Sequence, residues 1–124
     1  MLPEKFYDVL KNEGIVSIIS WGVTEPHVVN TWNSYIVVTP DERILIPAAG
    51  MRKTEKNVNQ NNLIKMALGS KEVVGYNDYQ GTGFVIEGTA KFIDSGSDFD
   101  QMKEKFAFLT RVLEITATSA KQML

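Results

Sequence analysis

The sequence contains no cysteine, which excludes a disulfide framework, a thiol nucleophile and an iron–sulfur ligand set. It has a single histidine, His27, which any histidine-dependent nucleophile would have to use. His27 follows Pro26 at the start of a predicted strand, and no sequence feature brings a serine beside it. We interpret it as a structural residue. We therefore expect no catalytic triad. With one histidine, no cysteine and no spaced carboxylate cluster, we also expect no metal site.

Excess charge of one sign and long hydrophobic runs are also missing. The net charge of -2 argues against general nucleic-acid binding, which needs a basic surface. No apolar run approaches the roughly 20 residues of a membrane span. Residues 1–5 lack the basic-then-apolar pattern of a signal peptide. We expect a cytoplasmic protein with no nucleic-acid or membrane partner, and its 124 residues fit a single domain over residues 1–124.

Hydrophobic periodicity and turn residues predict the order of the elements. In the first half they predict a helix that Gly14 ends, and strands over residues 15–21, 27–38 and 43–47. In the second half they predict a short helix with Thr54 as N-cap, ending near residue 59. Strands over 63–68 and 71–76 should follow, joined by a tight turn at Gly69-Ser70, and then a strand over 84–92. Ser97 should cap a helix that ends near residue 109, before a last strand from residue 112.

This count of about six strands with short helices between them predicts a mainly β protein. Closely spaced strands do not suggest a regular βαβ series, which would need a long helix between successive strands. An antiparallel barrel with helices packed on it is the better architecture.

The stretch from residue 47 to residue 55 has the composition of an anion-binding loop. It follows an apolar, β-branched run and precedes a polar segment of helical composition. Ala48, Ala49 and Gly50 allow a close approach to the main chain, and Arg52 and Lys53 add positive charge. A helix N-terminus next to them would complete a phosphate site. The alternative is an ordinary strand-to-helix loop with solvated charges, since no phosphate-loop or dinucleotide glycine pattern is present.

A second segment, residues 30–35 (Asn-Thr-Trp-Asn-Ser-Tyr), combines polar side chains with two large aromatics in a predicted central strand. Burying Asn30, Thr31 and Asn33 without partners would cost roughly 1–3 kcal/mol each. Either the backbone or a polar planar ligand must satisfy those that are buried. Together with the phosphate-like loop, the segment suggests a site for a phosphorylated aromatic cofactor.

Three other polar clusters have simpler interpretations. Asp41-Glu42 is typical of a turn, and Asp98 with Asp100 is typical of the first turn of a helix. Gln80-Gly81-Thr82-Gly83 precedes a strand and not a helix, so we interpret it as a turn whose N–H groups could also touch a ligand.

Three motifs carry a resemblance to a known family: residues 30–35, then Gly50-Met51-x-Lys53-Thr54-Glu55, then Gly81-Thr82-Gly83-Phe84. They resemble the small bacterial members of the FMN-binding split barrels, a family related to pyridoxamine 5′-phosphate oxidase. The likeness spans nearly the whole chain. It implies a six-stranded antiparallel split β-barrel that assembles as a homodimer, with FMN as cofactor near the subunit interface.

The resemblance also implies the roles of individual residues. Lys53 and Thr54 would bind the phosphate, helped by the backbone of Gly50 and Met51. Asn30, Thr31 and Trp32 would line the flavin, with Pro47, Ala48 and Ala49 behind the ring. Leu124 would lie over the flavin of the partner subunit. The chain departs from its relatives at Ala49, where they have glycine, and at Phe108, where they have tryptophan; both changes bear on access to the ring.

The resemblance leaves three functions open. The first is a homodimeric FMN-binding electron carrier, and the second is a flavin-dependent oxidoreductase that oxidises NAD(P)H or reduces a small substrate. The third is a non-redox flavin-binding role. The sequence contains no convincing acid, base or nicotinamide fingerprint, which favours the carrier, although hydride transfer is the cofactor's own chemistry and needs few protein groups.

Overall fold

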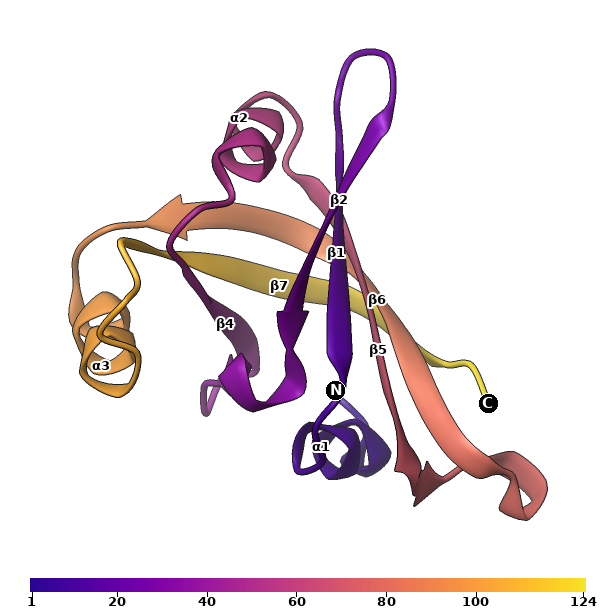
Figure 1. The fold of residues 1–124 in the computed structure, drawn as a ribbon. Coiled ribbons are helices and arrows are strands. Elements are labelled where there is room, and N and C mark those ends of the chain that lie inside the picture. The colour runs from indigo at the N-terminus through magenta and orange to yellow at the C-terminus, as the bar shows by residue number, and fades with distance from the viewer.

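A computed structural model describes residues 1–124, and its main feature is a single antiparallel sheet that curls on itself (Figure 1). The strand order is β2-β1-β5-β6-β7-β4-β3, so β2 lies at one edge and the pair β4 and β3 lies at the other. The strands are β1(Ile15–Trp21), β2(Pro26–Trp32), β3(Val37–Val38), β4(Arg43–Ala48), β5(Leu63–Val74), β6(Gln80–Ile93) and β7(Arg111–Gln122). This confirms the mainly β, antiparallel split-barrel fold, with the two-residue β3 as a seventh strand.

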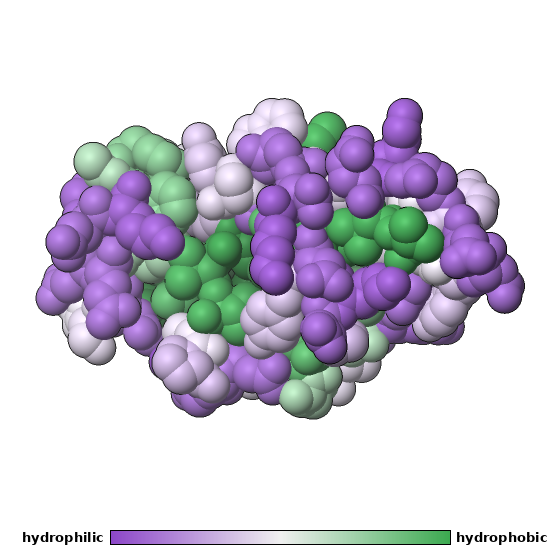
Figure 2. Space-filling view, turned by 90° about the horizontal axis from the view of Figure 1, so that it is seen from below, coloured by the Kyte–Doolittle hydropathy of each residue, from purple (hydrophilic) through white to green (hydrophobic).

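Three helices pack on this sheet: α1(Glu4–Leu10), α2(Arg52–Gln60) and α3(Ser97–Lys105). Helix α1 contributes the fully buried Phe6 and Val9 to the main core cluster of 18 residues, which fills the inside of the curl. Helix α3 covers a smaller cluster formed by Leu45, Met102, Leu109 and Val112. Seen from the α1 end, hydrophilic side chains cover most of the surface, and hydrophobic residues show in separate areas between them (Figure 2).

The predicted strand over residues 27–38 is wrong beyond Trp32. A 3₁₀ turn, η1(Asn33–Tyr35), breaks it, and Val37–Val38 pairs with β4 at the opposite edge of the sheet. The break has a clear cause in Asn33, which is 1 % exposed. Its backbone N–H donates to the carbonyl of Gly14 at 2.9 Å, and its side chain points inward, so the chain leaves the sheet there.

The predicted turn at Gly69-Ser70 is also wrong, because both residues lie inside the single long strand β5. Gly69 pairs with Gly83 of β6, where the two backbones come close. A Cβ on Gly69 would lie 2.8 Å from the carbonyl oxygen of Thr82, so the glycine allows a close approach of the paired strands and does not form a turn. The turn comes later, at η2(Tyr76–Asp78), where Asn77 and Asp78 have positive φ.

Two predicted helix caps are displaced by one or more residues. Met51, not Thr54, stands before the first residue of α2, and Thr54 is the third residue of the helix. Gly96, with φ 100°, stands before Ser97, which is the first residue of α3. Helix α3 also ends at Lys105 and not near residue 109. The helices of this chain are all too short or too polar to cross a membrane.

Candidate functional site: the β4–α2 loop and the edge of β2

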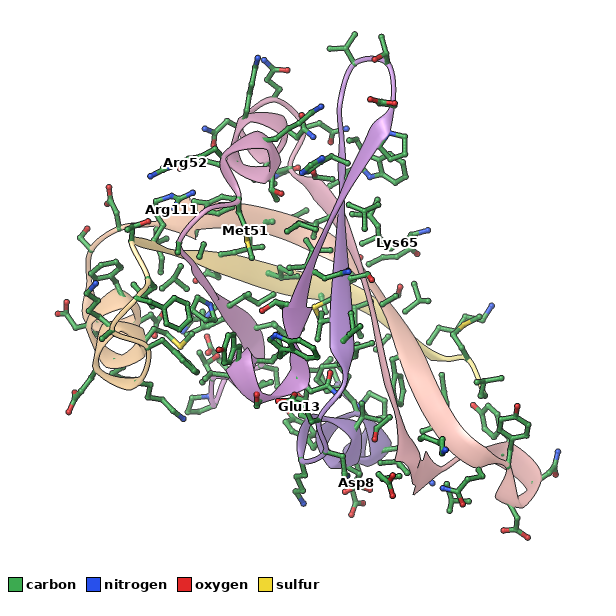
Figure 3. All side chains as sticks on the ribbon, viewed as in Figure 1. Asp8, Glu13, Met51, Arg52, Lys65 and Arg111 are labelled. Atoms are coloured by element: carbon green, nitrogen blue, oxygen red, sulfur yellow. The ribbon has the colours of Figure 1, made fainter.

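The loop from Ala49 to Met51 joins the buried end of β4 to the first residue of α2. Met51 adopts the left-handed conformation, with φ 59° and ψ 33°, and no side chain caps the helix. A left-handed residue immediately before a helix turns the chain sharply. The N–H groups of consecutive peptide units can then point toward one small concave space, which is a common way to bind an anion. Figure 3 shows the side chain of Met51 below α2, between the β4–α2 loop and β2.

Six consecutive backbone N–H groups, from Ala49 to Thr54, donate to no acceptor in the protein. The first hydrogen bond of the helix is made by Glu55, whose N–H donates to the carbonyl of Met51 at 2.9 Å. Free N–H groups at a helix N-terminus carry partial positive charge and bind anions, above all phosphate. The loop therefore has the donors that a phosphate group requires.

Thr54 supplies a second, independent indication of a ligand. Its side chain is completely buried, and its Oγ1 has no hydrogen-bond partner. A buried hydroxyl without a partner costs on the order of 1–3 kcal/mol, so such groups are rare unless something else satisfies them. A hydroxyl can donate to a phosphate oxygen, which is the role that the family resemblance implies for Thr54.

Two cations stand at the start of α2. Arg52 and Lys53 are both exposed; Arg52 pairs with Glu55 at 3.2 Å, and Lys53 forms no ion pair. Lys53 lines a polar cavity of about 470 Å³ between α2 and the β1–β2 turn at residues 22–25. Arg52 and Lys56 also face this cavity, with Glu25 on the opposite wall. The region beside the first turn of α2 is thus electropositive, which favours an anionic ligand.

The predicted flavin-lining residues lie along the end of β2. Thr31 is buried, at 7 % exposure, whereas Trp32 is 46 % exposed. Asn30 is exposed, and its Oδ1 accepts a hydrogen bond from the Ser17 hydroxyl at 2.8 Å. Because β2 is an edge strand, part of its backbone N–H and C=O groups has no partner strand. A flat ring with donors and acceptors on its rim could pair with such an edge.

The predicted phosphate residues lie together at the junction of β4 and α2. Pro47 and Ala48 are buried at the end of β4, and Ala49 and Gly50 are exposed in the loop. Helix α2 contacts β2, the strand that carries Asn30, Thr31 and Trp32. Leu124 lies elsewhere. Strand β7 begins at Arg111, opposite Ala48, and its 12 residues end at Gln122, roughly 36 Å away at a rise of about 3.3 Å per residue. Within one chain, Leu124 therefore lies far from the β4–α2 loop.

The residues just after Trp32 are held by a carboxylate. The Ser34 hydroxyl and the Ser34 N–H donate to the carboxylate of Glu13 at 2.7 and 3.1 Å. These hydrogen bonds lower the pKa of Glu13, so its negative charge persists to lower pH than is usual for a glutamate. Tyr35, from the same turn, packs against Phe108 with ring centroids 5.5 Å apart. Phe108, where the resembling family has tryptophan, thus lies in an aromatic cluster beside η1.

Arg111 belongs to this site but carried no signal in the sequence. It is 7 % exposed, and its guanidinium donates to the carbonyls of Ala49 and Gly50 at 3.2 and 2.7 Å. Arg111 and Gly50 are 61 residues apart in the sequence, so no local motif could predict this contact. Figure 3 shows Arg111 beside the start of α2, on the same side as Arg52.

Comparison with known proteins identifies a family and a relative. The family model described as "Pyridoxamine 5'-phosphate oxidase" matches residues 2–124. The chain is 47 % identical, over all 124 residues and the full length of the relative, to a protein named "FMN-binding protein" from Nitratidesulfovibrio vulgaris (strain DSM 19637 / Miyazaki F).

Solved structures share the fold at low sequence identity. HupZ of Group A Streptococcus superposes with a TM-score of 0.81 at 15 % identity, covering 99 % of this chain and 94 % of that chain. An FMN-binding protein from Syntrophomonas wolfei gives a TM-score of 0.70 at 14 % identity, covering 88 % of this chain and 76 % of that chain.

Proposed function

Because the chain belongs to the pyridoxamine 5′-phosphate oxidase family, we propose that it binds FMN as a homodimer and acts as a cytoplasmic electron carrier. One observation carries the cofactor assignment: the run of six unpartnered N–H groups from Ala49 to Thr54, next to the unpartnered hydroxyl of Thr54. This is a donor set for one phosphate group. FMN supplies the redox chemistry when bound, since it accepts and returns electrons.

The protein's part is to bind and orient the cofactor. In this proposal, the N–H groups of Gly50 and Met51 and the side chains of Lys53 and Thr54 hold the phosphate. The flavin ring lies along the edge of β2, at Asn30, Thr31 and Trp32, where unpaired backbone groups can bond its polar rim. Pro47, Ala48 and Ala49 form the wall behind it. The rigid strands on both sides keep the ring fixed, which suits electron transfer without a moving substrate.

A second copy of the chain is the proposed partner. In β1 and β2, Ile15 stands opposite Trp32 and Ile19 stands opposite Val28, so these residues share one face of the sheet. Ile15, Val28 and Trp32 are 54 %, 56 % and 46 % exposed. Apolar residues gathered on one sheet face are typical of a surface that a partner covers. Leu124, at 53 % exposure, would then reach the flavin of the partner subunit, since it lies far from the loop of its own chain.

We prefer the carrier to an oxidoreductase because no carboxylate or imidazole of the candidate site is placed as a general acid or base. Glu55, the carboxylate in the first turn of α2, is bound to Arg111 and Arg52. An enzyme would need room for a substrate beside the ring and groups to orient it.

The test is a visible spectrum of the purified protein after reconstitution, followed by release and chromatography of the flavin. We expect FMN and not FAD, because the loop offers donors for one phosphate and no second set for a pyrophosphate. Finding FAD, or no flavin, would overturn the cofactor assignment. Assays of NADH and NADPH oxidation then separate the two functions: slow or absent turnover supports the carrier, and rapid turnover supports the oxidoreductase.

A further inference from the structure

The guanidinium of Arg111 donates more hydrogen bonds than any other side chain of the protein. Arg111 is the first residue of β7, and it contacts a loop from the opposite strand, β4. Nη2 donates to the carbonyl of Gly50 at 2.7 Å, and Nη1 donates to the carbonyl of Ala49 at 3.2 Å and to the hydroxyl of Thr110 at 2.7 Å. The N–H of Thr110 donates to the carbonyl of Ala48 at 2.9 Å. Three consecutive carbonyls, that of Ala48 at the end of β4 and those of Ala49 and Gly50 in the loop, are therefore bound from the β7 side.

Binding the carbonyls from one side fixes where the amides point. The chain contains no cis peptide bonds, and in a planar trans peptide unit the C=O and N–H point in opposite directions. The carbonyls of Ala48, Ala49 and Gly50 face Arg111 and Thr110. The N–H groups of the same three peptide units, which belong to Ala49, Gly50 and Met51, therefore face away from β7. These are half of the unpartnered donors of the loop.

Arg111 also controls a charge at the site. Its Nη2 lies 3.1 Å from Oε1 of Glu55, a carboxylate in the first turn of α2. An unpaired carboxylate at this position would repel an anionic ligand. The side chain of Arg111 is only 8 % exposed, so the pair is screened little by solvent. Lysine cannot replace this geometry, because it has no planar fork to bond two carbonyls and a carboxylate at once.

We propose that Arg111 is a positioning residue for the FMN phosphate: it holds the β4–α2 loop so that its amides face the ligand, and it neutralises Glu55. It touches the loop and not the ligand. This inference rests on the proposed FMN site, and it assigns a role to a residue that no motif of the sequence includes.

The test compares Arg111→Gln and Arg111→Lys with wild type in titrations with FMN and with riboflavin, which lacks the phosphate. Arg111→Gln should weaken FMN roughly 10- to 100-fold, the effect expected from losing well-aligned hydrogen bonds to a charged group. Riboflavin should weaken much less, and Arg111→Lys should give an intermediate FMN-to-riboflavin ratio. A merely structural role would weaken both ligands equally, and that result would overturn the inference.

Arg43→Gln is the matched control. Arg43 lies at the other end of the same strand pair, opposite Thr116, and it binds Asp98 and Glu114, the latter at 2.7 Å. Its loss should lower stability without changing the FMN-to-riboflavin ratio. If Arg111→Gln does not fold, the ratio measured for Arg111→Lys decides between the two results.

An amide readout separates this inference from the cofactor assignment. In the protein without flavin, the amide resonances of Gly50 and Met51 should move in both Arg111 variants and stay in place in Arg43→Gln. Unchanged resonances would overturn the role of Arg111 even if wild type binds FMN. Shifted resonances in a protein that binds no FMN would overturn the cofactor assignment alone.

Discussion

Asn33 donates from Nδ2 to the carbonyl of Gly69 at 3.1 Å and so ties the end of β2 to the middle of β5. The same nitrogen lies 2.9 Å from the carbonyl of Asn12, just after α1. Three parts of the chain that are distant in sequence therefore meet at one buried amide. This contact ends β2 at Trp32 and sends the chain to the opposite edge of the sheet.

Replacing Asn33 with alanine should destabilise the fold. Carbonyls that now accept from Nδ2 would be left without a partner in a buried site, at a cost of about 1–3 kcal/mol in the free energy of unfolding. Urea unfolding measures this change. Asn30→Ala is the matched control, because the Asn30 side chain is exposed and its loss should change the free energy by no more than about 0.5 kcal/mol. Equal effects of the two substitutions would contradict the role of Asn33.

Stability should fall in acid because of Asp41. Hydrogen bonds from Arg43 and Thr39 lower the pKa of Asp41 from 3.8 to about 2. A carboxylate whose pKa is lowered in the folded state stabilises the protein above its unfolded pKa, and this contribution disappears as the pH falls through the folded pKa. We therefore expect the urea midpoint to drop between about pH 4 and pH 2. Asp41→Asn should show a smaller drop over this range, and an unchanged pH dependence would contradict the assignment.

In the proposed dimer, deleting Leu124 should uncover the flavin of the partner subunit. Burying one leucine side chain against the ring is worth about 1–3 kcal/mol at most. We expect weaker FMN binding, a shifted flavin spectrum and faster reaction with small oxidants, with the dimer retained. Flavin titration and sedimentation of the same sample measure both effects. Unchanged flavin binding would put Leu124 away from the cofactor, and a monomer would mean that this residue holds the dimer.

Local residue types were enough to predict the two halves of the candidate site. Small residues followed by cations mark the β4–α2 loop, and polar and aromatic residues together mark the end of β2. The contacts that shape these halves could not be predicted, because they join residues far apart in the chain. Arg111 reaches Gly50 across 61 positions, and Asn33 reaches Gly69 across 36.

The main wrong prediction in the second half of the chain is the turn at Gly69-Ser70, and it arises because glycine occurs both in turns and in strands. Gly69-Ser70 is a residue pair typical of a turn, but Gly69 is paired with Gly83 at a point where the neighbouring strands β5 and β6 come close. The same residue type serves both purposes, and only the partner strand distinguishes them. In the same way, threonine is a common N-cap residue, yet the N-cap of α2 is Met51 in the left-handed conformation. Thr54 is the third residue of the helix, and its hydroxyl is buried and unpartnered.

The central claim, that the first turn of α2 binds the phosphate of FMN, is tested most directly by Lys53→Ala. Removing a charge-assisted hydrogen bond costs about 1.5–3 kcal/mol, so FMN should bind roughly 10- to 150-fold more weakly, while riboflavin should change little. Lys56→Ala is the matched control, since Lys56 lies one turn further along the helix and faces the same cavity as Lys53. A drop in FMN affinity with Lys53→Ala alone is the predicted result. Equal weakening of FMN and riboflavin by Lys53→Ala, or an equal drop in FMN affinity in both variants, would contradict it.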